Sequence, residues 1–276
     1  MGSSSDFEDP YSQLCAIHIQ ANSLTNVKLE GTASGILIDS RHRYVLTHAS
    51  LLYPLHELFH HNLLRNLRIH GSSKTSKILL DNVNLEVILP NPPVNDNVAI
   101  SDDKNIQPVL LHNSTNNDRL FTKCKGRLKM VFEIKRLCEV IHSLMPKDTW
   151  TFEVDNNVLA GNNDSRESSY LPEKKNEDLY FFLLPCFVLI QLQDSPPLNK
   201  SPSLRFRDAS CNKVGDDVEI CATPFGSMSP DVFLNSRSRG IISKVTGRDK
   251  VLLMTDARCV PGCEGGGLFY VHKDER

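Results

Sequence analysis

Residues 255–269 read Thr-Asp-Ala-Arg-Cys-Val-Pro-Gly-Cys-Glu-Gly-Gly-Gly-Leu-Phe, and this stretch indicates the fold of the whole chain. A tight turn whose backbone N–H groups converge on one spot needs residues that reach positive φ without a Cβ clash. Gly262, Gly265, Gly266 and Gly267 supply that freedom. We therefore expect a loop that arranges donors for an anion, as an oxyanion hole does. On their own, the glycines are equally compatible with a flexible turn.

The stretch resembles the nucleophile loop of HtrA/Deg-related, trypsin-like serine proteases, which reads Thr-Asp-Ala, a short spacer, then Pro-Gly-Asn-Ser-Gly-Gly-Pro-Leu. Cys263 stands where that family has Asn, and Glu264 stands where it has the nucleophilic Ser. At neutral pH a Glu carboxylate only accepts hydrogen bonds, so it cannot act as a Ser hydroxyl does. It can instead occupy the oxyanion hole itself.

The resemblance extends upstream of this loop. Residues 214–226 contain Val-Gly, an apolar strand and Pro-Phe-Gly, and residues 239–243 read Arg-Gly-Ile-Ile-Ser. HtrA-type proteases carry Val-Gly, Pro-Phe-Gly and Thr-Gly-Ile-Val-Ser in this order. Residues 31–47 resemble the family's glycine-rich hairpin. The resemblance implies a mostly β, chymotrypsin/trypsin-like double β-barrel that is degenerate and has a partly helical insertion.

The expected domains follow from this resemblance and from periodicity. Apolar residues recur at helical spacing between Met130 and Leu144, and Pro146 follows them, which predicts a helix over residues 127–145. We expect a disordered N-terminus (1–10), a first barrel (11–100), an insertion (101–180) with that helix and a mobile loop (156–178), and a second barrel (181–276) that is incomplete and truncated at its C-terminal end.

The family's triad positions are vacated in this chain. The general-base His is expected three residues after Thr47, where the sequence has Ser50, and His48 is shifted from that position by two. The acidic member opens a strand in the family, and either Asn97 or Cys186 stands in its place. The sequence alone does not separate these two alternatives.

Two other catalytic patterns stay open. Residual peptidase activity would use Cys263 as the nucleophile with His48 as its base. Zinc-dependent hydrolysis would use the His-Glu-x-x-His pattern of His56, Glu57 and His60. That pattern is short, and its histidines border an apolar helical face, which favours an ordinary packed helix. We therefore expect no metal and no cofactor.

Composition limits the remaining functions. The net charge of −2 gives no basic excess for nucleic acid, and no apolar run approaches the ~20 residues of a membrane span. The N-terminus has no secretory signal, so we expect the eight cysteines to be reduced thiols.

The likeness points to peroxisomal members of this family, in which the N-terminal half resembles a decayed protease domain. It implies a peroxisomal matrix location and an endopeptidase that processes leader peptides of imported precursor proteins and enzymes of fatty-acid oxidation. The expected partners are a C-terminal protease domain or a second copy of the chain. No C-terminal Ser-Lys-Leu address is present in this chain.

Overall fold

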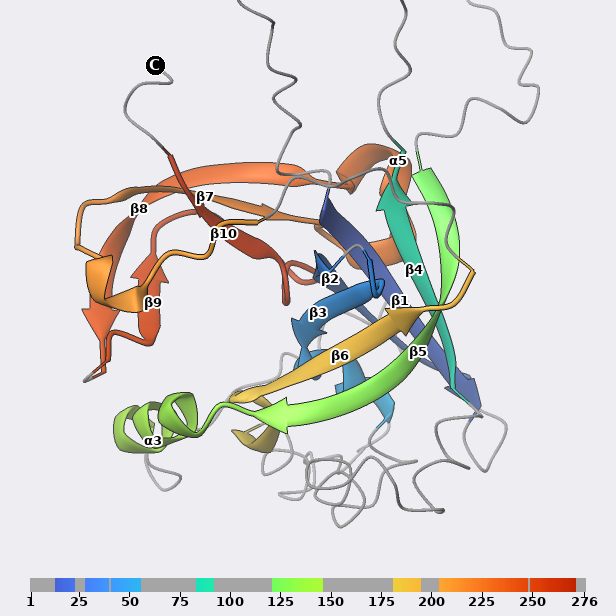
Figure 1. Ribbon diagram of the computed structural model, residues 1–276, viewed down its shortest axis with the longest axis horizontal. Helices are drawn as coiled ribbons and strands as arrows, with labels where there is room; N and C mark the ends of the chain where they lie inside the picture. Colours follow the sequence, from blue (N-terminus) through green and yellow to red (C-terminus); the bar gives the residue numbers. More distant parts are fainter. Residues whose placement is uncertain are drawn as a thin grey trace, which may run out of the picture.

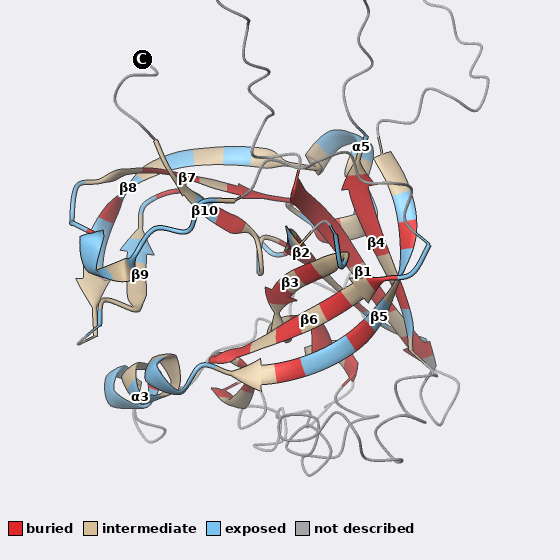
Figure 2. Cartoon of the chain, in the orientation of Figure 1, coloured by how far each residue is buried: buried red, intermediate tan, exposed pale blue. Residues whose placement is uncertain are grey.

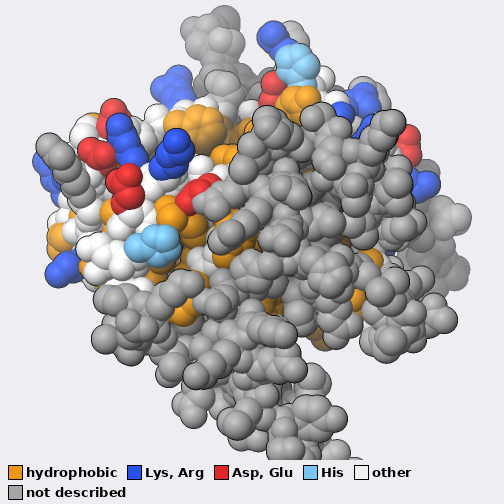
Figure 3. All heavy atoms as spheres, turned by 90° about the horizontal axis from the view of Figure 1, so that it is seen from below, with side chains coloured by type: hydrophobic (Ala, Val, Ile, Leu, Met, Phe, Trp, Pro, Cys, Tyr) orange, Lys and Arg blue, Asp and Glu red, His pale blue; other side chains and the backbone are white. Residues whose placement is uncertain are grey.

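The computed structural model describes residues 13–22, 28–39, 41–55, 83–91, 121–145, 181–194, 204–247 and 249–271. These residues are arranged mainly as β-strands (Figure 1), which confirms the prediction of a mostly β fold. None of the described helices is long and apolar enough to cross a membrane. On the face seen in Figure 3, Lys and Arg side chains lie beside Asp and Glu rather than gathering alone.

Six strands close into a barrel, with the neighbour order β1-β2-β3-β6-β5-β4, and all neighbours are antiparallel. This closed barrel is compatible with a chymotrypsin-like fold. The strands are β1 (Leu14–Asn22), β2 (Lys28–Asp39), β3 (Tyr44–His48), β4 (Asn84–Pro90), β5 (Phe121–Glu133) and β6 (Cys186–Leu192).

The barrel is filled by alternate residues of its strands, since successive side chains of a strand point to opposite faces. In β6 every second residue is buried (Figure 2). Ile17 and Ile19 of β1 are fully buried in the same cluster. Burial in this core raises the pKa of the Cys15 thiol far above its ordinary value. The short helix η2 (Ala49–Leu55) follows β3 directly and adds Leu51, Leu52 and Leu55 to the core.

A second, four-stranded antiparallel sheet has the order β10-β7-β8-β9 (Figure 1). Its strands are β7 (Asp217–Ala222), β8 (Ser236–Thr246), β9 (Leu252–Thr255) and β10 (Gly267–Tyr270). The described short helices around it are η4 (Ala209–Cys211), η5 (Gly226–Met228) and α5 (Pro230–Phe233). Helix η5 contacts β1 and β2, and this joins the second sheet to the barrel.

The helix predicted over residues 127–145 is wrong in its first part. Strand β5 continues to Glu133, and helix α3 covers only Lys135–Leu144. The helical spacing begins at Met130, which lies four residues before Ile134 and so continues the spacing of α3 into the strand. Strand β5 also has a register shift between Leu128 and Met130. Because of this irregularity, the buried residues Cys124, Leu128 and Val131 follow one another at intervals of four and three, as they would on a helix.

The predicted limits of the first barrel also need correction. Strand β5 lies in the range predicted as an insertion (101–180), and β6 lies in the range assigned to the second barrel (181–276), yet both close the first barrel. These pairings are long-range, so local sequence patterns did not reveal them. The expected disordered N-terminus (1–10) and mobile loop (156–178) lie outside the described residues.

Candidate functional site

Two successive turns form the loop between β9 and β10. The N–H of Cys263 donates to the Val260 carbonyl at 3.1 Å, and the N–H of Gly266 donates to the Cys263 carbonyl at 3.0 Å. The third residue of each turn is a glycine with positive φ, +96° at Gly262 and +83° at Gly265. A type II turn requires positive φ at this position and favours the proline that precedes Gly262.

Gly266 has a different role from the one predicted, because its φ is not positive. A Cβ on Gly266 would lie 2.7 Å from the Cβ of Ala222 and 2.8 Å from the Cys221 carbonyl oxygen. A side chain at this position would therefore collide with the end of β7. Gly266 allows the loop to pack closely against the second sheet, whereas Gly262 and Gly265 shape its turns.

The side chain of Glu264 folds back onto its own loop. Its Oε2 accepts a hydrogen bond of 2.7 Å from the N–H of Gly262. In a chymotrypsin-type oxyanion hole, the donors are the N–H of the nucleophile residue and that of the residue two positions before it. If Glu264 takes the nucleophile's position, as the resemblance implies, Gly262 corresponds to the second donor. The Glu264 carboxylate then accepts from a donor that catalysis would need for a developing oxyanion.

Ser34 of β2 connects this loop to the first barrel. Its side chain, which is 1% exposed, donates to the Gly262 carbonyl at 2.7 Å and accepts from the Thr223 N–H at 2.8 Å. Its backbone N–H donates to the Glu264 carbonyl at 2.8 Å. Ser34 thereby binds both turns of the loop and the end of β7. Sequence reasoning missed it, although a serine inside the apolar strand at residues 31–38 was a signal.

His48 lies at the end of β3, and Ser50 follows it in η2. The His48 Nε2 lies 2.9 Å from the Leu184 carbonyl oxygen. A carbonyl only accepts, so Nε2 carries the proton. The lone pair on Nδ1 then accepts from the Ser50 hydroxyl at 2.9 Å and from the Ser50 N–H at 3.2 Å. Both ring nitrogens are therefore engaged.

Cys186 opens β6, which pairs with β3 so that Phe187 lies opposite His48. Cys186, one of the two residues proposed for the acid position, therefore lies next to the residue that faces His48. Its buried Sγ donates to the Phe182 carbonyl at 3.2 Å, and it offers no carboxylate to a histidine. The other candidate, Asn97, lies outside the described residues.

Cys263 is half-buried in the loop, and within the described part of the chain no hydrogen bond joins it to His48. Burial, followed by the charges of Cys263 and Glu264, raises the pKa of the neighbouring Cys259 thiol. The thiolate is the reactive form, so this environment disfavours a nucleophile at Cys259.

The proposed zinc ligands His56 and His60, with Glu57 between them, all lie outside the described residues. Within the described ranges, no group of three or more His, Cys, Asp or Glu side chains is placed to hold a metal ion.

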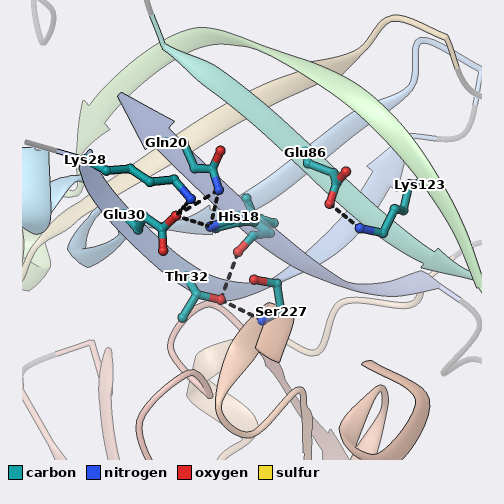
Figure 4. A network of polar contacts seen from close by, with 9 residues as sticks. His18, Gln20, Lys28, Glu30, Thr32, Glu86, Lys123 and Ser227 are labelled. Carbon is teal, nitrogen blue, oxygen red and sulfur yellow. Dashed lines mark hydrogen bonds and ion pairs between the residues drawn. The ribbon is translucent and has the colours of Figure 1, made fainter. Parts of the chain in front are cut away.

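A polar hollow of about 430 Å³ lies where η5 meets the outer wall of the barrel (Figure 4). It is lined by His18, Glu30, Glu86 and Lys123, with Met228 from η5. Lys28 pairs with Glu30, and Lys123 pairs with Glu86 at 2.9 Å. These charges compensate one another, so the hollow does not favour a ligand of either sign.

Comparison with known proteins shows what the chain resembles. No protein-family description matches the chain. Among curated proteins, the peroxisomal leader peptide-processing protease of Homo sapiens is 40% identical to it over 77 residues. The protease of the same name from Mus musculus is 57% identical over 55 residues. The chain is a homologue of these proteases over part of its length.

The aligned residues make up 28% of this chain and 13% of the human peroxisomal leader peptide-processing protease. For the mouse protein the corresponding shares are 20% and 9%. The chain therefore matches about an eighth or less of the length of each relative. The likeness to peroxisomal processing proteases, inferred from the sequence, is confirmed over these stretches.

Proposed function

We propose that this chain is a catalytically silent, protease-like module of a peroxisomal serine endopeptidase that processes leader peptides. The module itself has a scaffolding, regulatory or dimerising role. One observation carries the proposal: the Glu264 carboxylate is hydrogen-bonded to the Gly262 N–H at 2.7 Å. The loop keeps the backbone arrangement of an oxyanion hole, and its own Glu264 carboxylate accepts from one of the donors.

The chemistry of acyl transfer supports the proposal that this module has no catalytic activity. A serine protease needs a hydroxyl nucleophile, a histidine that removes its proton, and a carboxylate that orients the histidine. Here Glu264 and Ser50 take the first two places, and either Asn97 or Cys186 takes the third. None of them supplies the required group. The histidine nearest the base position, His48, directs its lone pair at Ser50 rather than at the loop.

The names of the homologues support a location for the chain, and the resemblance to the protease family suggests its partners. Both homologues are named as peroxisomal leader peptide-processing proteases, which supports the peroxisome, and we place the chain in the matrix by the family resemblance. The parent enzyme would act on imported precursor proteins and on enzymes of fatty-acid oxidation. Its working triad would lie in a C-terminal protease domain, which this module would hold, regulate or bring together with a second copy.

Incubation of the purified chain with a leader-bearing peroxisomal precursor tests the proposal. We expect the wild-type chain, Glu264→Ser and Cys263→Ala to leave the precursor intact. Glu264→Ser restores a hydroxyl but no base, so it should also remain inactive. Cleavage that disappears in Cys263→Ala would overturn the proposal in favour of a Cys263 and His48 peptidase. Cleavage that a chelator abolishes would instead assign the activity to His56, Glu57 and His60.

A further inference from the structure

His48 and Ser50 form a hydrogen-bonded pair of the kind that activates a nucleophile. The Ser50 hydroxyl donates to the His48 Nδ1 at 2.9 Å, so the imidazole lone pair is placed to remove the hydroxyl proton. The Leu184 carbonyl accepts from Nε2 at 2.9 Å and fixes this tautomer. A carbonyl oxygen thereby takes the orienting place that a carboxylate has in a Ser-His-Asp triad.

The pair lies on the outer face of the barrel wall. Cys186 and Val188, on either side of Phe187 in β6, belong to the barrel core. Successive side chains of a strand point to opposite faces, so Phe187 points outward. His48 lies opposite Phe187 and shares its face. His48 and Ser50 are both half-buried rather than enclosed, so the hydroxyl is not sealed from solvent.

An apolar row extends from this pair across the barrel wall. Phe187 lies opposite His48, and Phe132 of β5 lies opposite Phe187. The Phe187 ring meets the His48 ring edge to face, with 5.6 Å between centroids, and stacks on the Phe132 ring at 6.2 Å. Neighbouring strands lie about 4.8 Å apart, so the row reaches about 10 Å from the histidine. Both phenylalanines are half-buried, and Met130 on the same face of β5 is 44% exposed, which leaves apolar surface for a hydrocarbon chain.

We propose that Ser50 is an acyl-acceptor site that takes an apolar acyl group from an activated ester. The Ser50 Oγ attacks the ester carbonyl carbon while the His48 Nδ1 takes the hydroxyl proton. The bond from that carbon to the leaving oxygen then breaks, and the leaving group departs as an alcohol with the proton from His48. Ser50 becomes the new ester, with its hydrocarbon chain along Phe187 and Phe132. This single acylation of the chain goes beyond the proposed function and does not use Glu264.

The ester p-nitrophenyl octanoate tests the proposal on the full chain. Peptide mapping by mass spectrometry measures acylation at Ser50 separately from acylation of thiols and amines elsewhere. The exposed hydroxyl of Ser243 is the internal comparison. General-base assistance contributes at least about a hundredfold, so Ser50 should gain the octanoyl group about a hundredfold faster than Ser243. The acetate ester lacks a chain for the aromatic row and should acylate Ser50 at least about tenfold more slowly, after correction for the reactivity of each ester with free imidazole.

Variants of the pair separate reactivity from folding. The Ser50 N–H also donates to the His48 Nδ1 at 3.2 Å, so His48 also holds the start of η2. His48→Asn keeps a side-chain acceptor for this N–H but removes the base, so the Tm should stay close to that of wild type while acylation of Ser50 falls about a hundredfold. Ser50→Ala should abolish acylation at this position, and Ser50→Cys should restore it, because a thiol also accepts an acyl group.

The apolar row has its own variant. Met130→Gln makes the exposed end of the row polar, so it should slow octanoyl transfer to Ser50 and leave acetyl transfer unchanged. Acylation of Ser50 no faster than that of Ser243 in the folded wild-type chain would overturn the proposal. Acylation that persists in His48→Asn, or equal corrected rates for the octanoate and acetate esters, would overturn it as well.

Discussion

Ser34→Ala removes the side chain that connects the candidate loop to the first barrel. The Ser34 Oγ donates to Gly262 and accepts from Thr223, both at buried positions. Alanine fits the same space but leaves the Thr223 N–H and the Gly262 carbonyl without this partner. Because the substitution removes only one oxygen, cavity effects are small. The expected loss of stability therefore arises from two buried polar groups.

An unsatisfied buried polar group costs about 1–3 kcal/mol, so the two groups predict a destabilisation of about 2–6 kcal/mol. Urea unfolding followed by circular dichroism measures this change in the free energy of unfolding. Ser229→Ala is the matched control, because Ser229 precedes α5 and its side chain makes no capping hydrogen bond. That variant should change stability by less than about 0.5 kcal/mol.

The Ser34 contacts also predict a change in cooperativity, because they join β2 to the loop and to the end of β7. Ser34→Ala should make the second sheet exchange its amide hydrogens faster than the barrel does. A loss of stability no larger than that of Ser229→Ala, with uniform exchange, would refute the claim that Ser34 couples the two sheets.

Three further predictions concern a close contact, an acidic turn and the thiols. Gly226 has φ +58°, and a Cβ at this position would overlap the side chain of Thr32, so Gly226→Ala should lower the free energy of unfolding by more than about 3 kcal/mol. The control is Gly215→Ala, at φ +88° with nothing within 4 Å of the added Cβ, which should cost only about 1 kcal/mol. Urea unfolding measures both changes. Hydrogen bonds from the His42 backbone and ring hold the pKa of Asp39 below its ordinary value. The ionised Asp39 therefore stabilises the fold above about pH 4, and this stabilisation is lost as the pH falls. The Tm difference between wild type and Asp39→Asn should shrink below that pH. Limited alkylation followed by mass spectrometry should find exposed Cys211 modified before Cys259, whose pKa is raised, and buried Cys15 unmodified until unfolding.

The loop was predictable because its geometry is local. Pro261 and Gly262 occupy the centre of one turn, and Gly265 occupies the positive-φ position of the next, so residue type alone specifies both. The expectation that Glu264 takes up an oxyanion-hole donor came from the same local pattern.

Features that depend on long-range pairing were not predictable in this way. The sequence predicts a helix over the second half of strand β5 because Met130 and Ile134 continue the helical spacing of α3, whereas its pairing with the distant strand β6 makes it a strand. The coupling through Ser34 joins positions 34, 223 and 262, which no sequence window contains. The orientation of His48 depends on the Leu184 carbonyl, which belongs to a distant segment.

The most direct test of the central claim is the amide resonance of Gly262 in a ¹⁵N-labelled chain, compared between wild type, Glu264→Ala and the control Glu139→Ala on exposed α3. A hydrogen bond to a carboxylate is short and strong, so the wild-type amide proton should resonate downfield and exchange slowly. We predict that Glu264→Ala shifts this resonance upfield and speeds its exchange, while Glu139→Ala leaves both unchanged. An unaltered Gly262 amide in Glu264→Ala would contradict the account, because it would show that the Glu264 carboxylate does not accept from the Gly262 N–H in the wild-type chain.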